Sequence, residues 1–397
     1  MATSRVDAGG DGLLDDVREG LSFQLEEIDE TITAMVADQA AERARDGELI
    51  PLRLGLDGER PETLTLLGIR YELSRDRVRQ IYTRAIGQLI RRVQATGVPS
   101  TAVFAERYPV GWGDERLVRT LLAETYATDA DIAAQDLAYL KLRLAGHGLL
   151  DSKRIAGFVF QRIAGWQQRG RWHPTEPRQA DPAAGLATPL LRRAVWGSGT
   201  PAALPSTPLE TLDAADDARG SMFTEKLGRE ASFDTALEAR LLRVLDQGEQ
   251  VETFVERPGA VEYRLDGARR THHPTVAARL TDGRIMAIDV VPLGRLAVYG
   301  NRMKLAASRA WAHERGWGWL VFTGSRMGAD DLARHEVDAR HENALRNRLA
   351  RGPMGWGEFA RFVEETGIDV VDLSAMVVRH GWRWERGPFR LARDVSG

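Results

Sequence analysis

The sequence predicts a multidomain fold, with an all-α N-terminal half, then an α/β domain, and a small winged-helix-like appendix at the C-terminus. Apolar residues recur at helical spacing through roughly the first 170 residues. A stretch rich in Pro, Ala, Thr and Asp follows at 173–220 and is typical of a linker. Beyond it, short apolar runs and a turn at Asp282-Gly283 indicate strands interleaved with helices. With 397 residues, the chain is long enough for two or three domains with a core each.

Composition narrows the class of protein. The chain is 43% hydrophobic and 28% charged, with no run of about 18 apolar residues and no signal-peptide pattern, so we expect a cytoplasmic, nucleoid-associated protein without a membrane partner. The absence of cysteine excludes disulfides, cysteine-ligated zinc and thiol nucleophiles. The net charge of −3 argues against a protein that coats nucleic acid indiscriminately. Because residues 1–50 hold 13 acids against 4 bases, whereas residues 74–92 hold 6 bases against 1 acid, any nucleic-acid contact should be local.

Residues 1–12 are small, polar and glycine-rich, and we expect them to be disordered. From residue 13 to about residue 45, the spacing predicts an amphipathic helix or helix pair with an acidic outer face. We expect that face to be solvated; the alternatives are that it mimics DNA or meets a basic partner. The apolar positions are Leu21, Leu25, Ile28, Ile32, Met35 and Val36.

A helix-turn-helix is predicted at 63–92, within a first domain at 13–98. Thr63 and Ser74 are suitable N-caps for a short helix and a longer one. One side of the longer helix is apolar, and Arg and Gln gather on the opposite side, where they can bond to guanine and adenine edges in the major groove. An ordinary solvated helix is the alternative. The apolar side contains Val78, Ile81, Tyr82, Ala85 and Leu89, and the polar side contains Arg75, Asp76, Arg79, Gln80 and Thr83.

Residues 53–89, RLGLDGERPETLTLLGIRYELSRDRVRQIYTRAIGQL, resemble region 4 of bacterial primary sigma factors. The resemblance implies that the second helix faces the promoter −35 element and that the domain docks on the flap of the RNA polymerase β subunit. Asp76 and Tyr82 replace glutamates that are usual in the family, so we expect the DNA specificity to differ there. The expected DNA-binding residues are Ser74, Arg75, Asp76, Arg77, Arg79, Gln80, Thr83 and Arg84.

A second helical domain is expected at 99–172, with Phe158, Phe160 and Trp166 in its core. Basic residues near its end are typical of a helix C-terminus, with contact to DNA phosphates as the alternative. The linker at 173–220 then separates this half from the α/β domain at 221–340.

The order of elements in the α/β domain is helix, three strands, helix, strand, from about Ser232 to Gly324. This order resembles the core of the PD-(D/E)xK restriction-endonuclease-like superfamily, and most of all its transposon-end endonuclease subunits. By that resemblance, Glu238 matches the helix carboxylate and Asp289 the second acid, whereas Thr275 stands in place of the metal-binding Asp and Val291 in place of the catalytic Lys.

Metal-dependent phosphodiester cleavage needs clustered carboxylates and a cation that orients water. Thr275 and Val291 supply neither, so we expect an inactive nuclease-like domain without catalytic residues, bound metal or cofactor. Lys304 is the alternative candidate for the role of the missing lysine. His272 and His273 are expected to lie in a loop and to bind no metal.

The C-terminal residues 341–397 predict two helices followed by a short basic hairpin, the pattern of a winged helix. Trp382, Trp384 and Phe389 either close a small core or stack on DNA or a partner.

The function expected from these features is that of a sequence-specific transcription regulator that engages promoter double-stranded DNA, RNA polymerase, or both. Two alternatives are an active metal-dependent endonuclease of a mobile-element or defence system, and a polymerase-binding adaptor without DNA contact.

Overall fold

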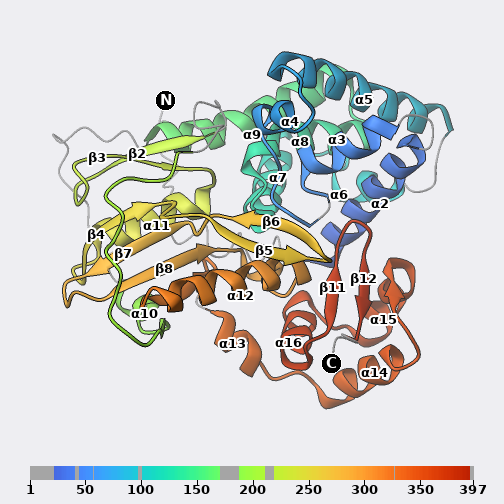
Figure 1. Cartoon of the computed structure of the whole chain (residues 1–397). Helices are drawn as coiled ribbons and strands as arrows, with labels where there is room; N and C mark the ends of the chain where they lie inside the picture. Colours follow the sequence, from blue (N-terminus) through green and yellow to red (C-terminus); the bar gives the residue numbers. More distant parts are fainter. Residues whose placement is uncertain are drawn as a thin grey trace, which may run out of the picture.

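The computed structural model describes residues 22–40, 44–56, 58–96, 101–169, 187–210, 219–325 and 327–393. Residues 1–12, expected to be disordered, lie outside these ranges. Figure 1 shows a helical N-terminal half, an α/β part beside it and a C-terminal part of helices and short strands. The N-terminal helices are α2 (Phe23–Ala40), α3 (Ala44–Leu54), α4 (Leu64–Arg70), α5 (Arg75–Thr96), α6 (Ala102–Arg107), α7 (Asp114–Thr128), α8 (Ala134–Leu144) and α9 (Leu149–Arg169), with a 3-10 turn, η2, at Asp131–Ala133.

One hydrophobic core runs through the N-terminal half. Ile28 on α2 and Leu89 on α5 belong to the same buried cluster as Phe104, Leu121 and Ile155, which lie beyond residue 99. The boundary predicted at residues 98 and 99 therefore passes through a shared core. The two predicted helical domains pack as one unit around it.

Helices α4 and α5 begin where the predicted caps place them. The Thr63 side chain accepts a hydrogen bond from the Leu66 amide at 3.2 Å, and Ser74 Oγ accepts one from the Arg77 amide at 3.2 Å. Between the two helices, the Leu73 amide donates to the Gly68 carbonyl at 2.8 Å. Both expected N-caps are confirmed.

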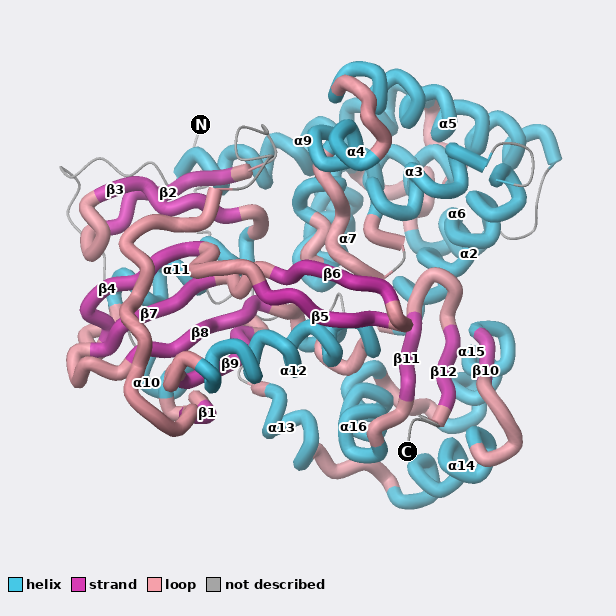
Figure 2. The backbone as a smooth tube through the Cα atoms, in the orientation of Figure 1, coloured by secondary structure: helices cyan, strands magenta, loops and turns pink. Residues whose placement is uncertain are grey.

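The α/β part is built on a five-stranded sheet of order β1-β9-β8-β7-β4. β8 and β9 are parallel, the other pairs are antiparallel, and helix α12 makes the crossover between β8 and β9. Apolar residues of α11 pack on one face of the sheet, and Figure 2 shows α12 running along it. The bounds are β1 (Val195–Trp196), α11 (Ala236–Gln247), β4 (Val251–Glu256), β7 (Val276–Leu280), β8 (Ile285–Val290), α12 (Tyr299–Glu314) and β9 (Gly318–Phe322).

Two hairpins stand apart from this sheet. β2 (Gly220–Thr224) pairs with β3 (Arg229–Phe233), and β5 (Val261–Leu265) pairs with β6 (Ala268–His272). β5 therefore pairs with β6 and with no strand of the five-stranded sheet. His272 ends β6, so the expectation that it lies in a loop was wrong.

Part of the predicted linker is structured. α10 (Ala187–Leu191) and β1 lie within 173–220, and β1 forms an edge of the sheet, with Val195 opposite Trp319. The linker prediction was therefore wrong for these residues. A two-residue strand has too few side chains to show an alternating pattern, which is why periodicity missed it.

The C-terminal part packs its aromatic residues inward. Trp382, Trp384 and Phe389 are all buried in one cluster, which confirms the core alternative and leaves no stacking surface. The bounds are α13 (Ala329–Arg334), α14 (Ala339–Leu349), β10 (Met354–Gly355), α15 (Trp356–Thr366), α16 (Val370–His380), β11 (Arg383–Glu385) and β12 (Arg390–Ala392), and the three strands form a sheet of order β10-β12-β11. None of the described helices is both long and apolar enough to cross a membrane.

Candidate functional site

Helix α5 presents a continuous polar face to solvent. The eight residues expected to bind DNA, at positions 74–77, 79, 80, 83 and 84, are all exposed, and Val78 between them is fully buried. Arg77 Nη1 donates to Gln80 Oε1 at 3.3 Å, which orders part of this face. The amphipathic division predicted from spacing is confirmed, and the polar face is free of covering elements in the described structure.

Tyr82 does not belong to this face. Its side chain is 6% exposed and packs in the N-terminal core, where its hydroxyl has no hydrogen-bond partner in the described structure. Tyr82 therefore does not lie on the exposed face from which α5 would contact DNA. An aromatic ring at this position extends the core instead.

A cavity of about 730 Å³ lies next to the polar face, between α5, α8 and α9. Arg75, Arg79 and Thr83 line one side of it, and Lys153 and Phe160 of α9 line the other. Phe160 is 45% exposed and Phe158 is 40% exposed, so the expectation that both are core residues was wrong. The expectation that Trp166 is a core residue concerns a side chain that the structure does not describe.

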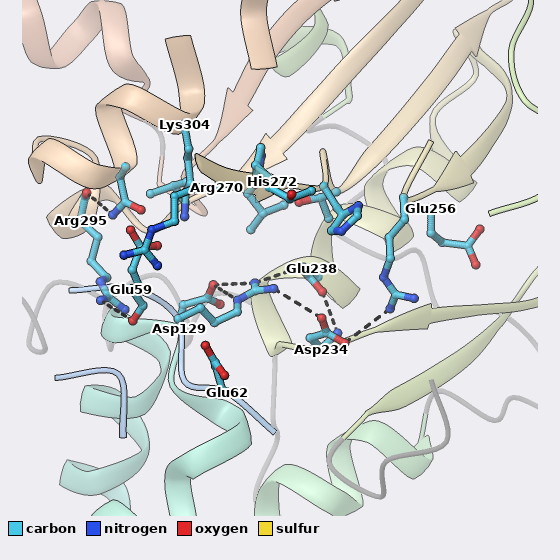
Figure 3. Close-up of a pocket in the computed structure, with 18 of the residues that line it drawn as sticks. Glu59, Glu62, Asp129, Asp234, Glu238, Glu256, Arg270, His272, Arg295 and Lys304 are labelled. Carbon is cyan, nitrogen blue, oxygen red and sulfur yellow. Dashed lines mark hydrogen bonds and ion pairs between the residues drawn. The ribbon is translucent and has the colours of Figure 1, made fainter. Parts of the chain in front are cut away.

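A second cavity of about 700 Å³ lies where the N-terminal half meets the α/β part (Figure 3). Glu238, Thr275, Val291 and Lys304, four of the five residues expected from the nuclease resemblance, line it together. The structure thus brings this set to one place from α11, from the start of β7, from the end of β8 and from α12.

Asp289 is absent from the cavity wall. It is fully buried behind the hairpin, where His272 Nε2 lies 2.6 Å from Oδ1 and Trp319 Nε1 donates to Oδ2 at 2.8 Å. Burial alone would raise its pKa, but these neighbours hold the pKa of Asp289 below its usual value. The carboxylate expected as a second acid fastens β6 to the sheet.

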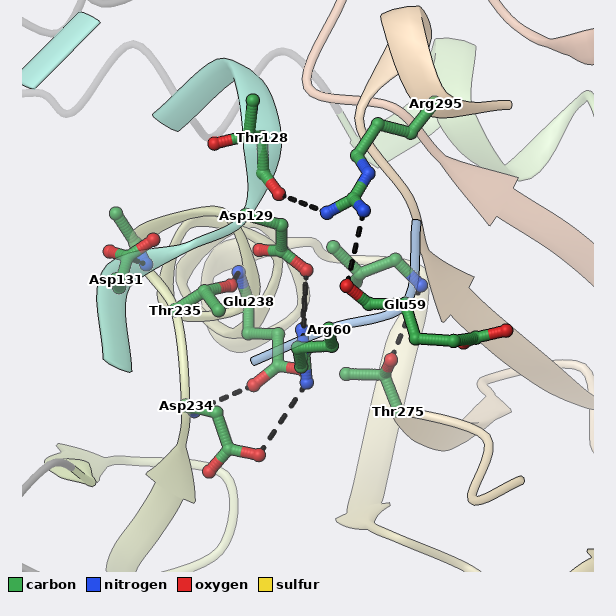
Figure 4. A network of polar contacts seen from close by, with 12 residues as sticks. Glu59, Arg60, Thr128, Asp129, Asp131, Asp234, Thr235, Glu238, Thr275 and Arg295 are labelled. Atoms are coloured by element: carbon green, nitrogen blue, oxygen red, sulfur yellow. Dashed lines mark hydrogen bonds and ion pairs between the residues drawn. The ribbon is translucent and has the colours of Figure 1, made fainter. Parts of the chain in front are cut away.

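Arg60 occupies the floor of the cavity among three carboxylates (Figure 4). Its Nη2 lies 2.6 Å from Asp129 Oδ2 and 2.8 Å from Glu238 Oε1, and its Nη1 lies 3.5 Å from Asp234 Oδ2. Asp129 caps the C-terminus of α7, whereas Asp234 and Glu238 come from the turn before α11 and its first turn. One guanidinium therefore ties the two halves of the molecule together.

The electrostatics of this cluster follow from its burial. Burial by itself would lower the pKa of Arg60. The three carboxylates outweigh this effect, so the pKa of Arg60 lies above its usual value. Burial and the like charges of Asp234 and Asp129 raise the pKa of Glu238 in spite of Arg60. Next to it, burial and Asp129 raise the pKa of Asp131 to about 8.

Arg295 makes a second connection between the halves. This side chain is 6% exposed, and its Nη2 donates to the carbonyls of Gly58 at 2.7 Å and Glu59 at 3.1 Å. Its Nη1 donates to the Thr128 carbonyl at 2.5 Å. The residue binds backbone only, so its positive charge is not matched by a carboxylate in these contacts.

The acidic face of α2 is engaged by the C-terminal hairpin. Arg386 lies 2.8 Å from Glu26 and 2.7 Å from Asp29, and the Phe389 amide donates to Glu30. The expectation of a solvated face was wrong at these residues, because a basic partner comes from the same chain.

Helix α16 is covered by other parts of the chain. Met376 packs in the C-terminal core, and Ala375 lies in a cluster shared with Leu332 of α13.

Sequence reasoning missed Arg60, Asp129 and Asp234, since residues 69 to 174 positions apart carry no joint signal in one sequence. Within the ranges that the structure covers, no group of three or more His, Cys, Asp or Glu side chains is arranged to hold a metal ion. No protein-family model matches the chain, and a search of curated proteins finds no similar sequence.

Proposed function

We propose that the protein is a sequence-specific DNA-binding transcription regulator that reads promoter DNA with helix α5. The observation that carries the proposal is the polar face of α5, exposed over three turns and set on a helix-turn-helix. Arg79 and Gln80 side chains have the donor and acceptor geometry to bond to guanine and adenine edges. The segment's likeness to sigma region 4 supports promoter DNA as the target.

The turn before α5 supports the same role. A Cβ atom at Gly68 would lie 2.7 Å from the Leu73 carbonyl oxygen, so the two helices approach too closely for any larger residue. A tight, glycine-dependent turn fixes the angle at which α5 can enter a major groove. The other expected partner, the flap of the RNA polymerase β subunit, is supported by exposed apolar side chains beside α5, including Phe160.

In this proposal, the α/β part is an inactive nuclease-like domain that holds the domain with helix α5 in place. The order α11, β4, β7, β8, α12, β9 supports a restriction-endonuclease-like core, and helix, strand, two helices and two strands after residue 339 support a winged-helix-like appendix. Loss of catalysis is supported by the partners of the acids: Arg60 neutralises Glu238, and His272 and Trp319 satisfy Asp289.

DNA selection from a random duplex pool, followed by fluorescence anisotropy at fixed salt, tests DNA binding by α5. Arg79→Ala and Gln80→Ala should each weaken binding to the selected site by about 1–3 kcal/mol and relax the preference at one base pair. Arg91→Ala is the matched control, because Arg91 is exposed on the same helix about 18 Å further along its axis. Unchanged affinity and preference in both test variants would refute the assignment of α5.

The competing function, a metal-dependent nuclease, predicts a different result. Incubation of plasmid with the protein and Mg²⁺ or Mn²⁺ should leave the plasmid intact under our proposal. Cleavage that Glu238→Gln abolishes would establish the nuclease instead. Capture of RNA polymerase from the host by the wild-type chain, with no binding to DNA on its own, would establish the adaptor.

A further inference from the structure

The cavity between the halves contains positive charge that the protein does not neutralise. Arg270 and Lys304 both extend into it (Figure 3), and no hydrogen bond or ion pair joins either of them to another residue of the described ranges. Arg295, also in the wall, binds only backbone carbonyls. Arg269 of the same wall also makes no hydrogen bond or ion pair with the described residues, so four cations are left without a carboxylate partner in one cavity.

The acids of the same cavity are mostly engaged elsewhere. Arg60 binds Asp129, Asp234 and Glu238, as described above, and Arg70 binds Glu62. Glu256 accepts two hydrogen bonds from Arg229, which is not in the wall. Among the acids of the wall, Glu59 has the largest effect on the pKa of Lys304.

Lys304 shows the effect of this imbalance. Burial lowers its pKa, and the positive charges of Arg60 and Arg295 also lower it, against the opposing effects of Glu59 and Asp129. A bound anion would restore the missing counter-charge and the hydrogen bonds of the ammonium group. The wall is therefore complementary to a group with negative charge.

Both strands of the β5–β6 hairpin contribute side chains to the wall of the cavity. Tyr263 lies opposite Arg270 in the register, so both side chains project from the same face, and both line the cavity. Arg264, the next residue, lies on the other face opposite Arg269, and of these two only Arg269 lines the cavity. An aromatic ring next to an unpaired guanidinium provides a surface for a flat ring joined to an anion.

The volume of the cavity and the acidic residues in its wall restrict the kind of ligand further. A volume of about 700 Å³ is within the usual range for small-molecule sites of roughly 300–1,000 Å³. Glu59 and Glu62, on the segment before α4, form an acidic part of the wall, which would repel a continuous polyanion but accept hydrogen bonds from hydroxyl and amino groups. The chemistry required is an anionic end joined to a neutral polar body.

We infer that this cavity binds a nucleoside polyphosphate, with the phosphates at Arg270 and Lys304 and the nucleoside towards Tyr263 and the acidic wall. The inference does not depend on DNA binding by α5. Because the walls come from both halves, a bound nucleotide stabilises their association and raises the unfolding temperature of the full chain.

Calorimetric titration of the full chain with ATP, GTP, pyrophosphate and adenosine tests the inference, with thermal unfolding as the second readout. We expect at least one nucleotide to bind and to raise Tm, pyrophosphate to bind more weakly, and adenosine not to bind. Arg270→Ala and Lys304→Ala should each lower the affinity at least about tenfold, the effect of one charge-assisted hydrogen bond. Neither side chain makes a hydrogen bond or an ion pair within the described residues, so neither change breaks one.

Arg264→Ala is the matched control and should bind nucleotide as the wild type does. Absence of binding by all four probes at millimolar concentration would overturn the inference, as would equal affinities for Arg270→Ala, Lys304→Ala and the control. Pyrophosphate that binds as tightly as either nucleotide would overturn the assignment of the nucleoside to Tyr263 and the acidic wall.

Discussion

Gly68 is the residue on which the geometry of the helix-turn-helix depends most. Because its Cβ position lies 2.7 Å from a backbone oxygen, Gly68→Ala forces α4 and α5 apart. We expect this change to lower the free energy of unfolding by about 1–3 kcal/mol and to weaken DNA binding, measured by urea unfolding and by anisotropy.

Gly87 provides the control for that substitution. It lies inside α5, and the nearest atom to its Cβ position is Arg91 Nη1 at 3.6 Å. Alanine should therefore stabilise the helix by about 0.5–1 kcal/mol, since glycine is a poor helix former. Equal losses of stability in Gly68→Ala and Gly87→Ala would show that the close approach at the turn has no energetic consequence.

Asp131 makes stability depend on pH. Burial and Asp129 raise its pKa from 3.8 to about 8, and its carboxylate accepts a hydrogen bond from the Ala236 amide at 3.0 Å. A folded-state pKa above the unfolded one means that this group's contribution is fully present below about pH 4 and is lost as the pH rises towards 8. Asp131→Asn, which keeps an acceptor, should remove that loss.

The expected gain for Asp131→Asn is on the order of a few kcal/mol at pH 8.5, and it should shrink steadily towards pH 4. Urea unfolding of both proteins across this range measures the difference. A gain that stays constant with pH would contradict the prediction, because a packing effect alone does not titrate.

At the scale of elements, the contact between α2 and the β11–β12 hairpin joins the two ends of the described chain. Arg386 is 7% exposed and Glu26 is 8% exposed in their side chains. Arg386→Met leaves Glu26 buried without its counter-charge, so we expect a loss of about 3–5 kcal/mol in the free energy of unfolding, measured by chemical denaturation.

Arg390→Met is the comparison for this element contact. Arg390 is 49% exposed and pairs with Glu385, which is 26% exposed, so its loss should cost under about 1 kcal/mol. In a double-mutant cycle, Glu26→Gln should recover part of the loss in Arg386→Met. Additive losses would mean that the two side chains do not interact.

At the scale of the whole molecule, Arg60 couples the helical half to the α/β part. Arg60→Met leaves Asp129 and Glu238, both 8% exposed, without a cation between them. Because the Arg60 side chain is itself 31% exposed, solvent screens part of the effect, and we expect a loss of about 2–4 kcal/mol. Scanning calorimetry should show one transition in the wild type and two in this variant.

Arg70→Met separates the coupling from a general loss of charge. Arg70 is 46% exposed, and its partner Glu62 belongs to the same half of the molecule. This variant should keep a single transition close to that of the wild type. A single transition at the wild-type midpoint in Arg60→Met would show that the halves are held together by other contacts.

Local patterns were enough to predict α4 and α5 with their two caps and the elements α11, β4, β7, β8, α12 and β9, but they missed the β2–β3 hairpin and β6. These features depend on residues close in sequence, where a cap, a turn or a periodic apolar face is visible directly. The edge strand β1 and the exposed Phe158 and Phe160 were not predictable in this way, because pairing and burial depend on what lies opposite.

The sequence by itself determined that α5 has one apolar face and one Arg/Gln face, since helical periodicity alone decides which side chains share a side. Only the tertiary structure decided that Asp289 fastens a hairpin, that Arg386 meets the acidic face of α2, and that Arg60 lies among Asp129, Asp234 and Glu238. Those outcomes depend on contacts between residues far apart in the chain. Charged residues of one type are indistinguishable in the sequence. Whether each one holds a hairpin, joins two parts of the molecule or stays unpaired depends on the neighbours that the fold gives it.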